Sequence, residues 1–370
     1  MLRDKKILIV GSGITGITIA TLLKVNNPDQ NITIIEERDH IGGNLYDYNQ
    51  NGMIVQKYGP HVIHTNNRHV WEFLANYTEM YRYQHKVVGC VDGKYLSMPM
   101  NLDGLKEVLS DYLYNAFEKS MHMNFEYDTE ISLLQMLQHS DPIIKQVANH
   151  IYENILINYT QKQWNLKPED VDRELLQCGR FRFNKDCRYY DQTYQGVPLH
   201  GYHKLFETMC KTHDLHVHNH TPFVRSMIDA YDIIFYTGSI DNTELHDNID
   251  FEQLPYVGVN VNIHQQHKKT PAAVVNYPNM YNFTRMTDYS YFNRDWDKDY
   301  TYISVEYPYN CNDSKFYPIE NMKNKLLYET LKQNLPSNVI PCGRLGKYKY
   351  ITISQAVQSA FDIVQKYQKA

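Results

Sequence analysis

The residues with the clearest chemical meaning lie near the N-terminus, where glycines are spaced as Gly11-Ser12-Gly13-Ile14-Thr15-Gly16. In this spacing the first glycine makes a tight turn, the second lets the backbone approach a pyrophosphate, and the third lets a helix pack close to a strand. The N–H groups and the dipole at the start of such a helix attract phosphates. Glu36 ends the next apolar run, where a carboxylate accepts hydrogen bonds from ribose hydroxyls. The pattern predicts a dinucleotide site.

A second glycine pair, Gly42-Gly43, follows this acidic residue within the stretch ERDHIGGN. Backbone without side chains gives a second surface for an extended cofactor, which favours FAD over NAD. An ordinary Gly-Gly turn in an NAD-binding domain is the alternative. We expect this part of the chain to contact the cofactor through Gly11, Ser12, Gly13, Thr15, Gly16, Glu36, Arg38, Gly43 and Asn44.

The elements that must position these residues are visible as apolar runs. Residues 7–10 (ILIV) and 32–35 (ITII) are short buried strands, and residues 14–25 between them have helical periodicity. Strand, glycine turn, helix and strand form the opening of a doubly wound parallel sheet. Residues 231–241 (YDIIFYTGSID) resemble the first strand and turn, and 351–367 form an amphipathic helix. The dinucleotide domain is therefore predicted to be discontinuous.

The middle of the chain has other patterns. Residues 101–158 show apolar spacings of three and four, with Asp or Ser near the helix starts, which predicts a block of helices. Around 180–200 and 256–310, Tyr, Val and Thr alternate in short runs broken by Pro, Gly and Asn, which is typical of antiparallel strands. We predict an α/β multidomain fold with a Rossmann-like parallel sheet, a helical part and an antiparallel sheet.

Composition narrows the classes of partner. The chain has 370 residues and 43.7 kDa, enough for two or three domains. Its net charge of -5, its pI near 6.4 and the absence of a basic run argue against nucleic acid or an anionic membrane as a partner. The six cysteines form no CxxC pair, which favours reduced thiols in the cytoplasm. No apolar stretch is long enough to span a bilayer.

A histidine cluster, His213, His216, His218 and His220, invites a metal-site hypothesis. Alternation of the last three would place their imidazoles on one face of a strand, where they could bind zinc or nickel. A solvated strand edge is the plainer interpretation. We predict no metal site.

Eight sequence blocks, taken in order, resemble the bacterial UDP-galactopyranose mutases: ERDHIGGN (37–44), YGPHVIHT (58–65), NYTQKQW (158–164), RYYDQTYQGVPLHGY (188–202), FYTGSID (235–241), NFTRMTDY (282–289), YPI (317–319) and GRLGKYKY (343–350). The resemblance covers nearly the whole chain. It implies a homodimeric flavoprotein that works in the cytoplasm and supplies furanose precursors such as galactofuranose for polysaccharide biosynthesis. It also implies three domains: an FAD-binding domain of residues 1–75, 203–245 and 340–370, a helical domain of residues 100–165, and an antiparallel sheet domain of residues 76–99, 166–202 and 246–339.

The implied activity is that of an isomerase, which interconverts the pyranose and furanose forms of a nucleotide-diphosphate sugar without net oxidation. In such an enzyme reduced FAD acts as the nucleophile at the anomeric carbon and displaces the nucleoside diphosphate. UDP-galactopyranose is the expected substrate. NAD(P)H or a reductase is the expected source of electrons.

The resemblance also assigns roles to individual residues. Arg285 is expected to contact the diphosphate close to the flavin, and Tyr189, Tyr317 and Tyr350 to hydrogen-bond the diphosphate. Ordinary packing tyrosines and a surface arginine are the structural alternatives. Tyr159 and Trp164 match aromatic residues at the uridine. Gly59, His61 and His64 match residues beside the flavin near the sugar. Gly343, Arg344 and Ile353 match residues beside the ribityl and diphosphate portion of the cofactor.

The chain departs from the family pattern at the substrate end. The family's flap arginine falls on Cys178, and Arg180 or Arg182 on the same segment could replace it. Where the family has two phenylalanines at the uracil pocket, this chain has Ile155 and Leu156. Where the family has a Tyr-Arg-Ser block, this chain has Tyr256-Val257-Gly258, and it has Thr352 at a position that is acidic in the family.

Four functions stay open at this point. Drift within a UDP-galactopyranose mutase explains the departures, and so does a site rebuilt for another base or sugar, such as a dTDP- or GDP-linked one. An FAD-dependent oxidoreductase of the amine-oxidase type shares the N-terminal fingerprint, but the blocks beyond residue 150 speak against it. An inactive flavin-binding relative is the fourth.

Overall fold

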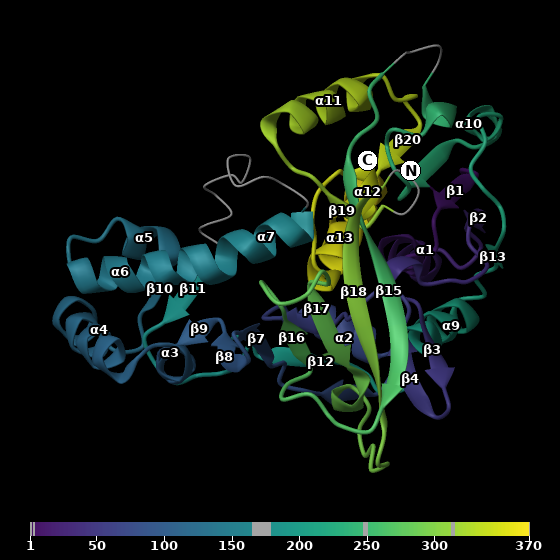
Figure 1. The fold of residues 1–370 in the computed structure, drawn as a ribbon. Helices are drawn as coiled ribbons and strands as arrows, with labels where there is room; N and C mark the ends of the chain where they lie inside the picture. Colours follow the sequence, from purple (N-terminus) through teal and green to yellow (C-terminus); the bar gives the residue numbers. More distant parts are fainter. Residues whose placement is uncertain (1, 3, 165–178, 247–250, 312–314, 370) are drawn as a thin grey trace. The chain divides into compact units, whose positions relative to one another are not determined.

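The computed structural model describes residues 2, 4–164, 179–246, 251–311 and 315–369. Figure 1 shows the helices and strands along the chain, which divides into two compact units. Unit 1 comprises residues 1–83, 192–258 and 310–370, and unit 2 comprises residues 84–191 and 259–309. Both units are assembled from separated stretches of sequence.

A five-stranded sheet forms the centre of unit 1. Its strand order is β13-β2-β1-β14-β20, and every neighbouring pair runs parallel. The strands are β1 (Ile7–Val10), β2 (Ile32–Ile35), β13 (Val217–His218), β14 (Ile233–Tyr236) and β20 (Val339–Pro341). This is the predicted doubly wound sheet, and the strand predicted at 231–241 lies directly beside β1.

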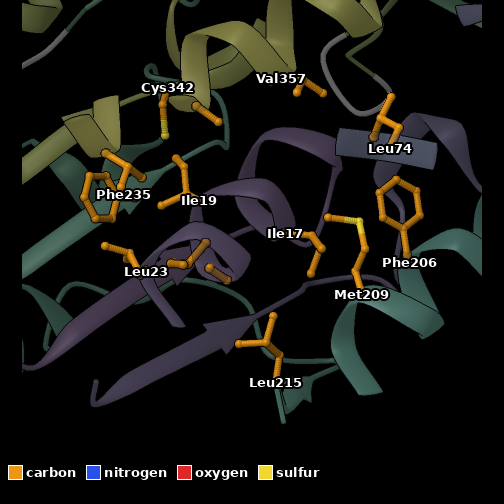
Figure 2. Close-up of a cluster of buried hydrophobic side chains, with 14 of the residues drawn as sticks. Ile17, Ile19, Leu23, Leu74, Phe206, Met209, Leu215, Phe235, Cys342 and Val357 are labelled. Atoms are coloured by element: carbon orange, nitrogen blue, oxygen red, sulfur yellow. The ribbon is translucent and has the colours of Figure 1, made fainter. Parts of the chain in front are cut away.

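Both faces of this sheet are buried, which explains why the first strand is apolar without alternation. Ile7 and Ile9 belong to one hydrophobic cluster, while Leu8 and Val10 belong to another on the opposite face. Figure 2 shows the first cluster, to which helices α1, α2, α9 and α13 contribute Ile17, Ile19, Leu23, Leu74, Phe206, Met209 and Val357.

The remaining elements of unit 1 cover this sheet or extend from it. The helices are α1 (Ile14–Asn26), α2 (Arg68–Ala75), α9 (Tyr202–Thr212), α10 (Met227–Ala230), α11 (Met322–Gln333), α12 (Gly343–Gly346) and α13 (Ile353–Lys369), with short 3-10 turns η1 (Gly43–Leu45) and η4 (Thr243–Leu245). The further strands are β3 (Asp47–Gln50), β4 (Met53–Gln56), β5 (Ile63–Thr65), β6 (Met80–Arg82), β12 (Tyr194–Pro198) and β19 (Tyr317–Pro318). Strands β3 and β4 form a hairpin, and β12 lies antiparallel between β5 and β6.

Unit 2 contains the predicted block of helices. The helices are α3 (Leu102–Val108), α4 (Asp111–Asn124), α5 (Leu133–Leu137), α6 (Pro142–Ile151), the π-helical turn η2 (Tyr152–Leu156) and α7 (Ile157–Trp164). Side chains that accept hydrogen bonds from the first turn cap four of them, namely Asn101, Ser110, Ser132 and Asp141. Beside these helices, β10 (Glu130–Ser132) pairs antiparallel with β11 (Arg180–Arg182), which also pairs parallel with β9 (Met100–Asn101).

The second sheet contains β15 (Tyr256–Gln266), β18 (Thr301–Cys311), β17 (Arg285–Asp288), β16 (Val274–Asn276), β7 (Val87–Val91) and β8 (Lys94–Met98), in that spatial order. A 3-10 turn, η5 (Tyr289–Tyr291), follows β17. Strand β17 pairs antiparallel with β16 and β18, and β7 pairs antiparallel with β8, whereas β16 and β7 run parallel. In unit 1, the first residues of β15 pair antiparallel with β19.

The predicted fold class, the helical block and the C-terminal helix are confirmed. The antiparallel strands predicted from alternation are confirmed as well. Those within 256–310 lie in the second sheet, which includes one parallel pair, and those within 180–200 are β11 and β12 of two three-stranded sheets. The division into three domains with the boundaries given above stays a prediction.

Candidate functional site

The candidate cofactor site is a cavity of about 480 Å³ in unit 1 at the carboxyl ends of β1, β2 and β14. This edge of a parallel sheet is where doubly wound folds bind ligands. Ten of the residues predicted to bind the cofactor line the cavity: Gly11, Gly13, Thr15, Glu36, Arg38, Gly43, Asn44, Gly343, Arg344 and Ile353.

The glycine turn has the geometry that its spacing predicts. Gly11 has a φ of +93°, and a Cβ atom there would lie 2.2 Å from the Thr237 hydroxyl. A Cβ atom on Gly16 would lie 2.1 Å from the Gly11 carbonyl oxygen, so this glycine serves helix packing behind the cavity. Gly13 differs, because a Cβ atom there would meet nothing nearer than the Gly43 Cα at 3.9 Å. Gly13 therefore leaves its space open to the cavity and not to a protein neighbour.

Gly13 is also the N-cap residue of α1, and no side chain caps this helix. The first N–H groups of a helix have no partner within the helix, so they are available to a phosphate. Gly13 forms an isolated β-bridge with Gly42, which has a φ of +107°. The two glycine motifs identified in the sequence therefore lie against each other at the N-terminus of α1.

Glu36 is buried, and backbone and side-chain donors fix its carboxylate. Its Oε2 accepts hydrogen bonds from the Ser12 N–H and the Ser12 hydroxyl, both at 2.8 Å, and its Oε1 accepts one from the Arg38 N–H at 3.1 Å. Ser12 is buried behind the cavity and holds Glu36 in place. Because each carboxylate oxygen has two lone pairs, Glu36 keeps capacity for a ribose hydroxyl.

Arg38 and Asn44 form one polar wall of the cavity. Both terminal nitrogens of Arg38 donate to the Asn44 side-chain oxygen, at 3.1 and 3.2 Å, and the guanidinium lies 4.7 Å from the centre of the Tyr58 ring. The Tyr58 hydroxyl is 2.8 Å from Nε2 of His40, a histidine whose pKa is lowered by burial. Burial also raises the pKa of Tyr58, so this wall contains a fixed cation with neutral partners.

The two predicted histidines are in different positions. His61 lines the cavity, and its Nδ1 lies 2.9 Å from the Gly59 carbonyl oxygen. A carbonyl only accepts hydrogen bonds, so Nδ1 carries the proton in this contact. Gly59, with a φ of +89°, orients His61 but does not line the cavity. His64 also does not line the cavity; it lies in β5 and pairs with Gln195 of β12.

Sequence reasoning missed part of the cavity wall. Thr221, Pro222 and Phe223 follow β13, and Thr237, Gly238 and Ser239 follow β14. The glycine turn after the strand at 231–241 was the available signal for the second group, since it repeats the pattern of the first strand. No local sequence pattern identifies Thr221, Pro222 and Phe223, which reach the cavity because β13 pairs with β2.

A charged pair at the cavity was also missed. The Lys315 ammonium lies 2.7 Å from the Asp241 carboxylate and 3.1 Å from the Ser239 hydroxyl, and the Asp241 side chain is fully buried. The Ser239 hydroxyl also bonds to Asp241 and lies 2.8 Å from the Tyr256 hydroxyl. Burial raises the pKa of Tyr256, so its phenol stays neutral. Tyr256, the residue that this chain keeps from the Tyr-Arg-Ser block, is thus a core residue of unit 1.

Arg344, which lines the cavity, lies beside two other predicted residues, Tyr317 and Tyr350. The Arg344 guanidinium carbon lies 5.5 Å from the ring centre of Tyr317 and 4.9 Å from that of Tyr350, and the two rings are 5.9 Å apart. Tyr350 is half exposed. Thr352, another family departure, forms a reciprocal pair of hydrogen bonds with Gln355 in the manner of a capping box for α13.

The other predicted residues lie in unit 2. The Arg285 Nε is 2.7 Å from a carboxylate oxygen of Glu306, whose side chain is almost fully buried, so the arginine is held by a buried anion. Tyr189 packs edge-on against His85, and its N–H donates to the His85 carbonyl at 2.8 Å. The Tyr159 hydroxyl lies 3.5 Å from the Asn276 side-chain oxygen. Trp164 is the last residue of α7, and Cys178 lies outside the described residues.

Arg180 and Arg182 both pair with Glu130 across the β10–β11 ladder, at 2.6 and 3.2 Å. Arg182 is nearly buried and also donates to the Arg188 carbonyl at 2.6 Å, whereas the Arg180 side chain is 58% exposed. The two candidates for the flap arginine therefore have different environments. Arg182 is bound on several sides within unit 2, and Arg180 is paired on one side.

In the described part of the chain, no group of three or more His, Cys, Asp or Glu side chains could hold a metal ion. No helix in the same part is both long and apolar enough to cross a membrane.

The sheet, the glycine turn and Glu36 define the class: this is a dinucleotide-binding protein with a Rossmann-like domain, and the family model described as NAD(P)-binding Rossmann-like domain matches residues 9–77. The family model described as UDP-galactopyranose mutase matches residues 154–350, more than half of the chain. The chain belongs to the UDP-galactopyranose mutase family, whose enzymes are isomerases.

Individual proteins agree with this membership. A probable UDP-galactopyranose mutase of Klebsiella pneumoniae is 28% identical over 377 residues, covering 97% of this chain and 94% of that protein. A dTDP-fucopyranose mutase of Escherichia coli is 27% identical over 379 residues, covering 98% of each. A crystal structure of reduced UDP-galactopyranose mutase shares the fold, with a TM-score of 0.71 and 15% identity over 100% of this chain and 94% of that one.

The environments of Arg180 and Arg182 predict different costs of substitution. Arg182→Ala should lower the free energy of unfolding by about 1–3 kcal/mol, because it removes charge-assisted hydrogen bonds from partly buried partners. Arg180→Ala, at an exposed pair, should cost less than about 1 kcal/mol. Denaturant unfolding measures both. Equal costs would mean that Arg182 is not part of the framework of unit 2.

Proposed function

We propose that this chain is a flavin-dependent nucleotide-sugar mutase that interconverts UDP-galactopyranose and UDP-galactofuranose. The observation that carries the proposal is that Arg344 lines the dinucleotide cavity and also contacts Tyr317 and Tyr350, two tyrosines assigned to the substrate diphosphate. Residues expected at the cofactor and residues expected at the substrate thus lie in the same unit. Membership of the family supports the reaction type.

The residues present fit FAD. Gly13 leaves room for a pyrophosphate at the uncapped start of α1, and Glu36 presents a fixed carboxylate for the adenosine ribose. Arg38, His61 and Arg344 line the same cavity and are available to the rest of the cofactor. When bound in its reduced form, FAD supplies a nucleophilic ring nitrogen to the anomeric carbon of the sugar.

The protein's own task is to bind the diphosphate and to stabilise it as it leaves the sugar. We assign Arg285 to this role, because buried Glu306 fixes its guanidinium and a fixed cation stabilises developing phosphate charge without reorganisation. Tyr189, Tyr317 and Tyr350 would donate phenolic hydrogen bonds to the same diphosphate. Tyr159 and Trp164 would contact the uridine. His61, which lines the cavity, and His64, which does not, would lie on the flavin side of the sugar.

We further propose a homodimer that works in the cytoplasm and receives its electrons from NAD(P)H or a reductase. These points follow from the family resemblance. An oxidoreductase of the amine-oxidase type is the less favoured alternative, because the mutase family model matches the region after the shared N-terminal fingerprint.

A second candidate function is a mutase for another nucleotide sugar, in which a different base or sugar, such as a dTDP- or GDP-linked one, replaces UDP-galactose. Ile155 is buried in the hydrophobic cluster of the unit 2 helices, within the π-helical turn, and Leu156 packs against that cluster. Neither side chain offers the aromatic stacking that a base gains from phenylalanine, worth about 1–3 kcal/mol. The similarity to a dTDP-fucopyranose mutase favours the same idea.

Gly13→Val tests the cofactor. The parent protein should be yellow and carry about one FAD per chain. The φ of -71° at Gly13 suits any residue, and a Cβ atom there meets no close protein atom, so the variant should fold but be colourless. Gly16→Ala is the contrast, because its Cβ atom would collide with the Gly11 carbonyl and lower stability as well. Circular dichroism and absorbance separate the two effects. A fully loaded Gly13→Val protein would contradict the assignment.

Arg285→Ala should lower turnover by about a hundredfold or more with unchanged FAD content, the loss typical of one preorganised charge-stabilising group. The substitution leaves Glu306 buried without its cation, so Arg285→Lys, which keeps a charge there, should show the same direction of effect in a stably folded protein. Arg294→Ala, at a more exposed arginine of the same unit, is the matched control. An Arg285→Ala enzyme within about threefold of the parent would place Arg285 away from the reaction.

A substrate panel decides between the mutase functions and the oxidoreductase. With a reductant, UDP-galactopyranose should be isomerised faster than dTDP- or GDP-linked pyranoses, and the reductant should not be consumed in proportion to turnover. Oxidised enzyme in air should be inactive, because oxidised flavin lacks the nucleophilic lone pair. Faster turnover of a dTDP- or GDP-linked sugar would establish the second candidate function instead.

The same panel applied to Cys178→Arg and Arg180→Ala tests whether Arg180 takes the place of the family's flap arginine. If it does, Arg180→Ala should raise the KM by about tenfold, the cost of one charge-assisted contact. Adding Cys178→Arg to the Arg180→Ala variant should then restore part of the loss. A KM unaffected by both substitutions would exclude Arg180 from the diphosphate site.

A further inference from the structure

Arg344 holds the backbone beside both substrate tyrosines of unit 1. Its Nη1 donates to the Phe316 carbonyl at 3.3 Å, and its Nη2 donates to the Ile351 carbonyl at 2.9 Å. Phe316 directly precedes Tyr317, and Ile351 directly follows Tyr350. One side chain therefore joins two segments more than thirty positions apart in sequence, at the peptides next to the two tyrosines.

The rings of the same tyrosines lie on this side chain. The guanidinium and the two rings form a triangle with sides of 5.5, 4.9 and 5.9 Å. A guanidinium is a rigid planar fork, so hydrogen bonds from both terminal nitrogens fix its orientation as well as its position. Fixing Arg344 therefore also restricts the directions in which the partly buried Tyr317 phenol and the half-exposed Tyr350 phenol can point.

The cavity side of this arrangement is equally constrained. Gly343 has a φ of +72° and approaches the Thr15 hydroxyl, which brings Arg344 to the edge of the first glycine turn. Arg344, Ile351 and Ile353 all line the dinucleotide cavity. Two of the five guanidinium N–H donors satisfy the carbonyls, and the remainder can bind an acceptor atom of a molecule in the cavity.

We infer that Arg344 is a positioning residue that couples the two ligands: a molecule in the dinucleotide cavity that accepts hydrogen bonds from the remaining guanidinium N–H groups stabilises the same arrangement of Arg344 that orients Tyr317 and Tyr350 for a nucleoside diphosphate. The inference rests on the proposed function, because it assigns the two tyrosines to the substrate. Coupling of this kind is reciprocal, so the diphosphate must tighten cofactor binding by the same factor. Order imposed by the first ligand lowers the cost of order for the second.

Arg344→Lys tests the coupling in the FAD-loaded enzyme, because lysine keeps the charge and loses the planar fork. With UDP as the probe, the variant's Kd should rise about tenfold or more at full FAD loading, and KM should rise much more than kcat falls. Lys349→Ala, at an exposed lysine beside Tyr350, should bind UDP like the parent. In a double-mutant cycle, Tyr350→Ala should cost less in the Arg344→Lys background than in the parent.

The reciprocal measurement needs no turnover. The fraction of FAD that the parent retains at equilibrium after dilution should rise when UDP is present, and this gain should disappear in Arg344→Lys. Equal UDP affinity in the parent and in Arg344→Lys, or FAD retention that ignores UDP in the parent, would overturn the inference. A parent enzyme that binds neither UDP nor dTDP would instead refute the proposed function, and the inference with it.

Discussion

At the carboxyl end of β1, three chain segments approach each other more closely than side chains permit. A Cβ atom on Gly11 would lie 2.2 Å from Thr237, one on Gly16 2.1 Å from Gly11, and one on Gly43 3.1 Å from Gly13. The helix start, the second glycine pair and the turn after β14 can converge only because these positions lack side chains. The cavity is the space that remains among them, so its existence depends on this backbone contact.

This constraint also explains why the cofactor unit is discontinuous. The segments that meet at β1 come from three parts of the chain, and parallel pairing of β1 with β2 and β14 is what brings them to one edge. Polar groups then compensate for the backbone left without partners. Ser12 and Glu36 bond to each other, and Thr237 donates to the Val10 carbonyl. The site is thus preorganised by hydrogen bonds that stabilise the fold itself.

The features predicted correctly from the sequence are those with a local cause. Glycine spacing, buried apolar runs and helix caps act over a few residues, so the dinucleotide turn and the helical block were identifiable. The Lys315–Asp241 pair was not, because its members are far apart in sequence and neither neighbourhood shows a pattern. Arg182 illustrates a different gap, since only the pairing of β11 with β10 reveals that its charge is bound by Glu130.

The cofactor cavity and the residues proposed for the substrate depend on different parts of the chain, backbone in the first and side chains in the second, and this determines where the chain can change. At the cofactor end, contacts come largely from backbone, and a substitution at Gly11 or Gly16 collides with neighbouring main chain or a fixed hydroxyl. The contacts proposed for the substrate instead come from side chains such as Arg180 and Leu156, which can be exchanged singly without moving the backbone. The departures at Cys178, Ile155 and Thr352 include none of the glycines. Thr352 shows how such an exchange can be retained, because it caps α13 while it lines the cavity. For the proposed function, the nucleotide sugar is therefore the property most open to change in this chain, and the cofactor is the property least open to change.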